Sequence, residues 1–238
     1  METIFKYLLT LVSVLFMTET ALGEDYPIID PVAIINAEDG TVTEIHPGEN
    51  YQGSAPLSVT FNANPQDADD WTANYEWRFY RDTERESPYL IRYEENTSFT
   101  FTEAGTHRIV CYTIFTRGEE RIEYTQEYWT QEIQPIQISI SESKLEMPNT
   151  FSPNNGDEIN NIYRAKSGYQ SLVEFKATIF NRWGQKLYEW TDPAGGWDGT
   201  YHGKDVAQGT YFVVVTAKGA DGRRFNIRKD VNLLRGHK

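Results

Sequence analysis

Residues 175–188 read Phe-Lys-Ala-Thr-Ile-Phe-Asn-Arg-Trp-Gly-Gln-Lys-Leu-Tyr, and this stretch indicates the fold of the chain. Phe175, Ala177 and Ile179 alternate with other residues, which is the period of a strand with one buried face. Gly184 supplies the positive φ that a tight turn requires, because glycine has no Cβ to clash. The stretch therefore predicts a β-hairpin with one apolar face.

A second apolar segment covers residues 209–217, which read Gly-Thr-Tyr-Phe-Val-Val-Val-Thr-Ala. Because its apolar run is almost continuous, we expect this strand to be buried on most sides. The Asp221-Gly222 dipeptide favours a turn into a closing strand over residues 224–234. With the hairpin, these segments predict a β-sandwich of about seven strands.

The first half of the chain also has the periodicity of strands, with no helical period of useful length between them. Trp77 is expected to pack between two sheets, as a large aromatic side chain of a sandwich core does. Short strands separated by turn residues are typical of β-sandwiches. The predicted fold class is therefore all-β, with two immunoglobulin-like β-sandwiches in tandem. The predicted elements of this half are a hairpin over residues 31–45 and strands at 57–61, 75–79, 98–101, 106–115, 121–129 and 133–140.

The charge of the chain changes sign near residue 146. Residues 24–146 hold 24 acids and 8 bases, a net charge of −16, whereas residues 147–238 hold 9 acids and 13 bases, a net charge of +4. We take this change as the domain boundary. An acidic first half argues against a nucleic-acid partner, because phosphate binding needs a concentrated basic face.

Residues 1–23 have the pattern of a secretory signal peptide. Lys6 precedes an apolar run over residues 7–17, and small residues at Ala21 and Gly23 fit cleavage after Gly23. The run is too short to span a bilayer, and no later segment reaches spanning length. We therefore expect an exported protein without a transmembrane segment, located between the periplasm and the outer-membrane surface or outside the cell.

Three motifs of the first half occur in a recognisable order. Residues 55–61 read Ala-Pro-Leu-Ser-Val-Thr-Phe, residues 75–79 Tyr-Glu-Trp-Arg-Phe, and residues 101–107 Phe-Thr-Glu-Ala-Gly-Thr-His. They resemble the frame of a PKD-type immunoglobulin-like domain, which implies such a module over residues 24–146. The Gly-Asp-Gly turn of that family is missing, because residues 80–83 and a longer charged insert stand there.

Five blocks of the second half also occur in a recognisable order. They read Pro-Asn-Thr-Phe-Ser-Pro-Asn-Asn-Gly-Asp-Glu-Ile-Asn from residue 148, Ile-Phe-Asn-Arg-Trp-Gly-Gln from 179, Gly-Trp-Asp-Gly-Thr-Tyr from 196, Gly-Thr-Tyr-Phe-Val-Val-Val from 209, and Leu-Leu-Arg-Gly from 233. Together they closely resemble the gliding-motility-associated C-terminal domain, also called the type B sorting domain of type IX secretion. The resemblance implies a Bacteroidetes-type cell envelope and a partner in the outer-membrane secretion machinery.

The site residues that this resemblance implies lie in four of the blocks. They are Pro148, Asn149, Phe151, Pro153, Asn154, Gly156, Asp157, Asn160, Phe180, Asn181, Arg182, Trp183, Gly184, Gly196, Trp197, Asp198, Gly199, Gly209, Thr210 and Tyr211.

Two further features of the residues allow competing interpretations. Asn155, Asp157 and Asn160 could supply oxygen ligands to Ca²⁺, or the loop could satisfy its own hydrogen bonds. Trp183, Trp190 and Trp197 are expected to pack at the end of the sandwich. The alternative is a sugar-stacking role, with loops carrying Trp71, Trp183 and Trp197.

The sequence contains no recognisable catalytic pattern. It has no Gly-x-Ser-x-Gly motif, its four histidines are scattered, and Cys111 is expected to be a buried strand residue. We therefore expect a non-catalytic exported protein without a cofactor, in which a C-terminal domain targets an N-terminal module for secretion or surface attachment. The alternatives are a glycan-binding or protein-binding surface module, or an assembly subunit that stays in the periplasm or outer membrane.

Overall fold

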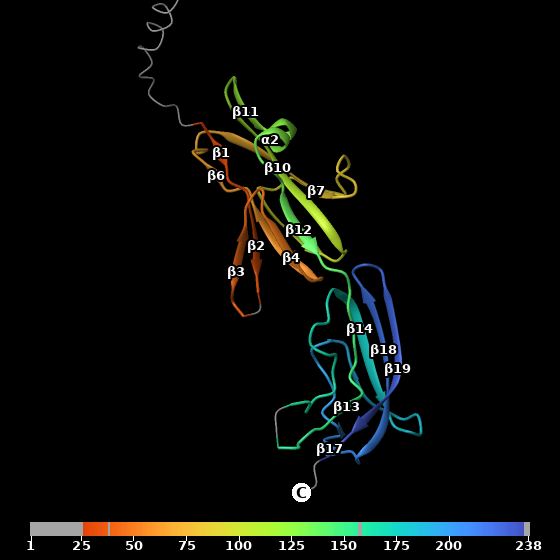
Figure 1. Ribbon diagram of the computed structural model, residues 1–238. Helices are drawn as coiled ribbons and strands as arrows, with labels where there is room; N and C mark the ends of the chain where they lie inside the picture. Colours follow the sequence, from red (N-terminus) through yellow and green to blue (C-terminus); the bar gives the residue numbers. More distant parts are fainter. Residues whose placement is uncertain (1–25, 38, 157–158, 236–238) are drawn as a thin grey trace, which may run out of the picture.

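The computed structural model describes residues 26–37, 39–156 and 159–235, and nearly all of its regular structure is β-strand (Figure 1). The strands form two bodies that follow one another end to end. We call them the N-terminal sandwich (residues 26–140) and the C-terminal sandwich (residues 145–235). The predicted fold class, all-β with sandwiches in tandem, is confirmed. The predicted signal peptide lies outside the described residues.

The N-terminal sandwich packs a four-stranded sheet against a six-stranded sheet, with all pairs antiparallel except β12 with β4. The four-stranded sheet has the order β3 (Val42–Ile45), β2 (Val32–Asn36), β5 (Leu57–Asn62), β9 (Asn96–Phe101). The six-stranded sheet has the order β4 (Asn50–Gly53), β12 (Ile136–Ile140), β10 (Gly105–Arg117), β7 (Thr72–Arg81), β8 (Leu90–Arg92), with β11 (Glu120–Tyr124) also paired to β10. A separate short pair joins β1 (Ile28–Ile29) and β6 (Pro65–Gln66).

The helix α2 (Gln126–Gln131) stands where the sequence predicted the end of a strand over residues 121–129. That part of the prediction is wrong, because β11 ends at Tyr124. Trp129 explains why a helix forms here. Its indole is buried, and its Nε1–H donates to the carbonyl oxygen of Cys111 at 2.9 Å. A buried indole N–H requires such a partner, so Trp129 anchors the helix on the outer face of β10.

The core of the N-terminal sandwich centres on Trp77, which is fully buried as predicted. The ring of Phe61 lies 5.6 Å from that of Trp77 and meets the ring of Phe79 edge-on at 5.2 Å. Edge-to-face pairs of this kind add to the free energy of burial. Cys111 is buried as expected, and this burial raises the pKa of its thiol to about 12. The thiol therefore stays protonated at neutral pH.

The C-terminal sandwich is built on one five-stranded sheet with the order β13-β19-β18-β14-β15. Loops carrying Tyr163 and Trp197 cover one face of this sheet, together with the small hairpin of β16 and β17. The bounds of the strands are β13 (Thr150–Phe151), β14 (Leu172–Phe180), β15 (Lys186–Trp190), β16 (Thr200–Tyr201), β17 (Lys204–Asp205), β18 (Gly209–Gly219) and β19 (Arg224–Leu233).

The burial of β18 differs from the prediction that this strand is buried on most sides. Tyr211, Val213 and Val215 are buried, but Phe212 is 45% exposed and Thr216 faces solvent. Successive side chains of a strand point to opposite faces of the sheet. Since no second layer covers the outer face within the described residues, every other apolar residue of the run lies at the surface.

The two sandwiches meet through polar contacts. Their buried apolar residues form two separate clusters, one in each body. Ser171 accepts a hydrogen bond from the backbone N–H of Ala55 at 3.1 Å and donates its own backbone N–H to Ser54 Oγ at 2.6 Å. Ser143 Oγ donates to Asp221 Oδ1 at 2.6 Å. Each body therefore has its own core, and the joint combines these hydrogen bonds with the packing of Val173 and Ala220 against the N-terminal cluster.

Gly219 lies at this joint where no side chain fits. A Cβ atom at this position would lie 2.1 Å from Ser143 Oγ and 2.3 Å from Ser143 Cβ. Gly219→Ala is expected to lower the free energy of unfolding by about 1–3 kcal/mol, the usual cost of overpacking, in urea denaturation. Adding Ser143→Gly should restore part of the loss, and an unchanged midpoint in the single variant would contradict the predicted clash.

Asp221 makes the joint sensitive to acid. The hydroxyl of Ser143, followed by backbone N–H donors, holds the pKa of this carboxyl below its usual value. A depressed carboxyl pKa stabilises the fold above the unfolded-state value, and the gain is lost as the pH falls through the native value. We expect Asp221→Asn to destabilise the protein at pH 7, and the difference from the unmodified chain to shrink below about pH 4. A difference that grows on acidification would exclude this role.

Candidate functional site: the motif groove of the C-terminal sandwich

Four aromatic rings bring the sequence blocks of the second half together. Phe151 lies 5.3 Å from the ring of Trp197 and 5.6 Å from that of Tyr163, and Trp197 lies 5.2 Å from Tyr211. All four rings are buried. Three of them, Phe151, Trp197 and Tyr211, are predicted site residues, and their burial assigns them to the core. Tyr163 was missed, because it stands between blocks in an irregular segment.

The backbone around Trp197 allows this packing. Tyr163 and Trp197 exchange two backbone hydrogen bonds of 2.8 and 3.0 Å, and the Nε1–H of Trp197 donates to the carbonyl oxygen of Thr200 at 2.7 Å. A Cβ atom on Gly196 would lie 2.5 Å from the carbonyl oxygen of Tyr163. Only glycine fits such a close approach of two backbones. The Gly196-Trp197 dipeptide therefore fixes the loop layer onto the sheet.

The first block is attached to the edge of the sheet by strand pairing and hydrogen bonds. Phe151 pairs with Leu233 in the parallel ladder of β13 and β19. The hydroxyl of Tyr163 donates to the carbonyl oxygen of Pro148 at 3.0 Å, and the ammonium of Lys229 donates to the side chain of Asn149. Pro148, Asn149 and Phe151, which are predicted site residues, therefore attach the start of the module to the sheet.

The asparagine-rich loop that follows hydrogen-bonds with itself. Ser152 donates its backbone N–H to the carbonyl oxygen of Asn160 at 2.9 Å, Asn155 Nδ2 donates to Ser152 Oγ at 3.2 Å, and Asn154 N–H donates to Asn161 Oδ1 at 3.1 Å. Asp157 lies outside the described residues, so the predicted calcium site remains a prediction. Among the residues that the structure describes, no group of three His, Cys, Asp or Glu side chains could hold a metal ion.

The remaining predicted site residues have local structural roles. Asp198 Oδ1 accepts hydrogen bonds from the backbone and hydroxyl of Thr200 at 2.9 and 2.8 Å. Thr210 donates its hydroxyl to Asn232 Oδ1 at 3.0 Å on the outer face of the sheet. Of the predicted glycines, Gly156, Gly184, Gly199 and Gly209 have a positive φ, and Pro153 lies against Gly199.

The turn between β14 and β15 points two side chains into solvent. The side-chain oxygen of Asn181 accepts the backbone N–H groups of Trp183 and Gln185, each at 3.0 Å. This side-chain turn leaves Trp183 77% exposed, with the guanidinium carbon of Arg182 at 4.5 Å from its ring centre. The prediction that Trp183 packs at the end of the sandwich is wrong, whereas Trp190 and Trp197 are buried as predicted.

A groove of about 530 Å³ lies beside this turn. It joins the block around Trp183 with Tyr201 and with the start of β18, where Phe212 is 45% exposed. Gln185 Nε2 donates to the hydroxyl of Tyr201 at 3.2 Å across it. We call this surface the motif groove. It is lined by Asn181, Arg182, Trp183, Gln185, Leu187, Tyr201, Val206, Ala207, Gln208, Gly209, Thr210, Tyr211 and Phe212.

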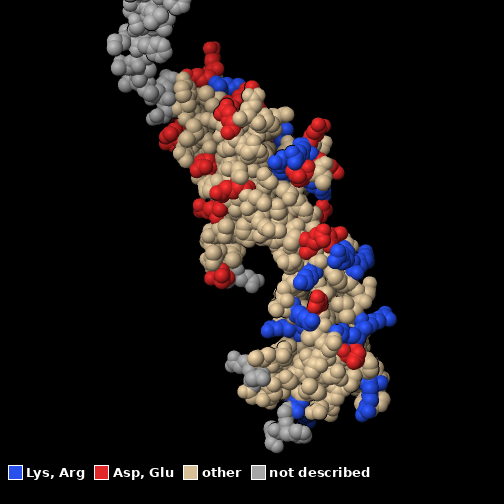
Figure 2. All heavy atoms as spheres, viewed as in Figure 1, with Lys and Arg blue, Asp and Glu red and all other residues tan. Residues whose placement is uncertain are grey.

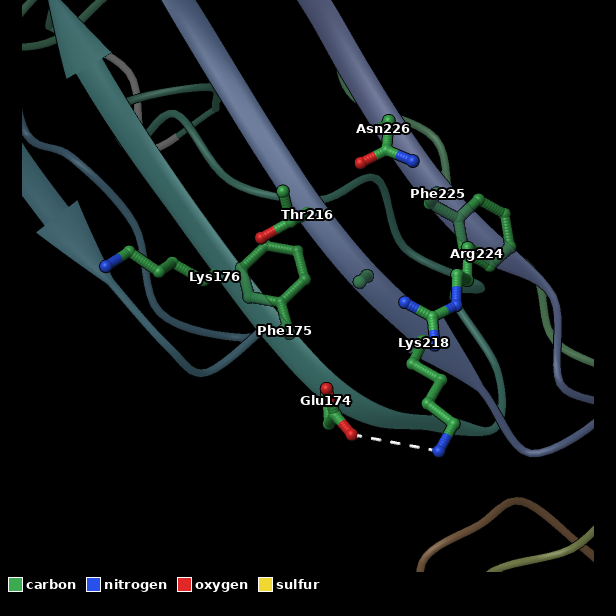
Figure 3. Close-up of a pocket in the computed structure, with 9 residues that line it drawn as sticks. Glu174, Phe175, Lys176, Thr216, Lys218, Arg224, Phe225 and Asn226 are labelled. Atoms are coloured by element: carbon green, nitrogen blue, oxygen red, sulfur yellow. Dashed lines mark ion pairs between the residues drawn. The ribbon is translucent and has the colours of Figure 1, made fainter.

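A second hollow, of about 430 Å³, lies on the same sheet nearer the joint (Figure 3). Lys176, Lys218 and Arg224 line it, and the ammonium of Lys218 lies 3.8 Å from the carboxylate of Glu174. None of the predicted motif residues lines this hollow. Motif residues that lie outside the core therefore come together at the motif groove.

Comparison with known proteins supports the resemblance of the second half. Residues 145–227 match the family model described as CHU_C Type IX secretion signal domain. This agrees with a C-terminal sorting domain, while the PKD-type resemblance of the first half remains a prediction. No curated protein matches the chain.

Two solved structures align with most of the chain at low similarity. One is the tetra-tandem repeat in the extending region of a large adhesion protein, with 11% identity, a TM-score of 0.26, and coverage of 88% of this chain and 68% of that one. The other is SGBP-B of a Bacteroides ovatus mixed-linkage glucan utilization locus in complex with a mixed-linkage heptasaccharide. It has 12% identity and a TM-score of 0.23, and the alignment covers 88% of this chain but only 48% of that chain.

Two tryptophans of the motif blocks should respond in opposite ways to truncation. Trp197→Ala removes a fully buried ring and is expected to cost about 3–5 kcal/mol of unfolding free energy, as large core truncations do. Trp183→Ala removes a ring that is 77% exposed and should change the unfolding free energy by about 0.5 kcal/mol or less. Equal losses in chemical denaturation would contradict the division into core and surface motif residues.

Proposed function

We propose that this chain is a non-catalytic protein exported to the cell surface, with residues 147–238 as its type IX sorting domain and residues 24–146 as the cargo. The match of residues 145–227 to a type IX secretion signal domain is the observation that carries the proposal. The predicted signal peptide would take the chain across the inner membrane, and the sorting domain would then take it across the outer membrane. Among the described residues, no helix is both long and apolar enough for a membrane span.

We infer that the motif groove is the part of the sorting domain that the secretion machinery contacts. A fold requires its buried residues whatever its partner is, but it does not require an exposed tryptophan. Exposed aromatic rings beside an arginine are typical of the energetic centre of protein interfaces. Trp183, Arg182 and Phe212 have these properties and lie around one groove.

The two sandwiches also differ in surface charge, which supports separate roles. Acidic side chains predominate on the visible face of the N-terminal sandwich, and basic side chains predominate on that of the C-terminal one (Figure 2). An acidic cargo stays soluble and repels other copies of itself. A basic label can be steered toward acidic partners by the same long-range field. The immunoglobulin-like cargo, PKD-like in its strand motifs, would serve in binding or in a surface structure.

The surroundings of His107 favour a non-catalytic role for this histidine. His107 is buried, its Nδ1 lies 2.9 Å from the hydroxyl of Tyr89, and its Nε2 lies 3.1 Å from the carbonyl oxygen of Glu103. Desolvation lowers the pKa of this imidazole, which keeps it neutral. Both ring nitrogens are thus engaged in the fold, and no nucleophilic side chain contacts them in these hydrogen bonds.

The export role is tested by fractionating cells of a type IX-competent host. The full chain should appear at the cell surface or in the medium, and a chain lacking residues 147–238 should stay in the periplasm. Trp183→Ala with Arg182→Ala should cut surface delivery at least several-fold without changing the melting temperature. Tyr188→Ala, which alters another partly exposed ring of the same module, is the matched control. Unchanged delivery after the deletion would exclude a sorting role and favour a resident envelope subunit.

A further inference from the structure

The outer face of the six-stranded sheet carries a groove that the core does not require. In the β7–β10 ladder, Glu76 pairs with Tyr112, Arg78 with Val110, and Tyr80 with Arg108. The neighbouring pair of Trp77 and Cys111 points into the core. Since successive residues of a strand point to opposite faces, the first set of side chains forms the floor of a surface groove.

Two walls rise beside this floor. On the β10 side stands α2, where Gln126 and the buried Trp129 line the groove. On the β7 side stands the segment around Arg85 and Glu86, followed by Tyr93, which is 70% exposed. The groove thus lies between a helix anchored on one strand and a loop attached to its neighbour.

The groove consists of two hollows in a row, of about 630 and 470 Å³. Both are lined by Arg78, Tyr112 and Gln126, so they adjoin at these side chains. Each hollow has the size of a small-molecule site. A ligand that fills both must be elongated, and it would pass the place where Arg78 and Tyr112 lie together.

The three arginines that line the groove are paired with carboxylates of the protein. Arg78 Nε donates to Glu76 Oε1 at 2.5 Å, and its guanidinium carbon lies 4.3 Å from the ring centre of Tyr112. Arg85 and Arg108 both lie against the carboxylate of Asp82, at 2.8 and 3.3 Å. A ligand with a net charge would compete with these ion pairs. A neutral ligand with many hydroxyl groups can use both the guanidinium and the carboxylate groups without breaking them.

We propose that this groove binds a neutral carbohydrate chain, with Tyr93 as the stacking ring and with Arg78, Glu76, Gln126 and the hydroxyl of Tyr112 as hydrogen-bonding groups. The proposal concerns the cargo module and holds whether or not the C-terminal sandwich directs export. It differs from the prediction of a site at Trp71, Trp183 and Trp197. Trp71 and Trp197 are buried, which excludes a platform of these three rings.

An extended peptide fits the groove less well than a carbohydrate. Peptides that bind sheets do so by adding a strand to an open edge. Here the floor is the face of β7 and β10, and these two strands are paired with each other along the whole floor. Only side chains are available for recognition, and they are amides, carboxylates, guanidinium groups and phenols. Burial raises the pKa of Tyr112 to about 12, so its hydroxyl remains a hydrogen-bond donor at neutral pH.

The test is affinity electrophoresis of the purified full chain in native gels. Separate gels contain xyloglucan, galactomannan, arabinoxylan or soluble starch as neutral polysaccharides, and polygalacturonate as an acidic one. We expect at least one neutral polysaccharide to retard the protein and polygalacturonate not to do so. Two variants should each raise the apparent dissociation constant at least ten-fold: the single variant Tyr93→Ala, and the double variant with Tyr93→Ala and Tyr112→Ala.

Two controls separate binding from folding. Tyr188→Ala makes the same truncation outside the groove and should be retarded like the unmodified chain. Because Tyr93 is 70% exposed, its single variant should keep the melting temperature of the unmodified chain. The proposal is overturned if no neutral polysaccharide retards the chain, if polygalacturonate retards it equally, or if the folded Tyr93 and Tyr112 variants bind as before.

Discussion

The burial of Trp197 against Phe151, Tyr163 and Tyr211 is the interaction on which the C-terminal sandwich depends. Its sheet has one apolar face, and no second full sheet covers that face within the described residues. Irregular segments must cover it, and irregular segments have unpaired backbone groups that are costly to bury. The mutual hydrogen bonds of Tyr163 and Trp197 satisfy these groups, and the aromatic rings supply the apolar contact. Three sequence blocks and the segment around Tyr163 are thereby drawn together.

This use of the blocks explains where recognition can occur. Once the rings of Phe151, Trp197 and Tyr211 are buried, exposed motif residues remain in the first block, at Asp198 and in two neighbouring elements. These two elements are the turn after β14 and the outer face of β18. They gather around the motif groove because β14 and β18 are neighbours in the sheet. The surface available to a partner is therefore a consequence of how the core is covered.

The joint between the sandwiches also reflects how each core is covered. Each body has its own buried apolar cluster, and the hydroxyl groups of Ser54, Ser171 and the linker residue Ser143 make hydrogen bonds at the joint. Polar interfaces are typical of modules that fold separately. In the N-terminal sandwich, the outer face of β7 and β10 stays accessible because α2 covers only one side of it.

The sequence by itself determined the strands and the core. Alternation with a period of two placed Trp77 and Cys111 inside, and it located the hairpin of β14 and β15, because side-chain direction in a strand depends only on local geometry. Tertiary structure decided the features that depend on distant partners. The helix α2 replaces a predicted strand because Trp129 finds the carbonyl oxygen of Cys111. Phe212 is exposed because no second layer among the described residues covers that face, and Trp183 points outward because a turn residue has no fixed side. Both grooves form where strands that are far apart in the sequence become neighbours in a sheet. The residue pattern within one strand does not specify which strand lies beside it.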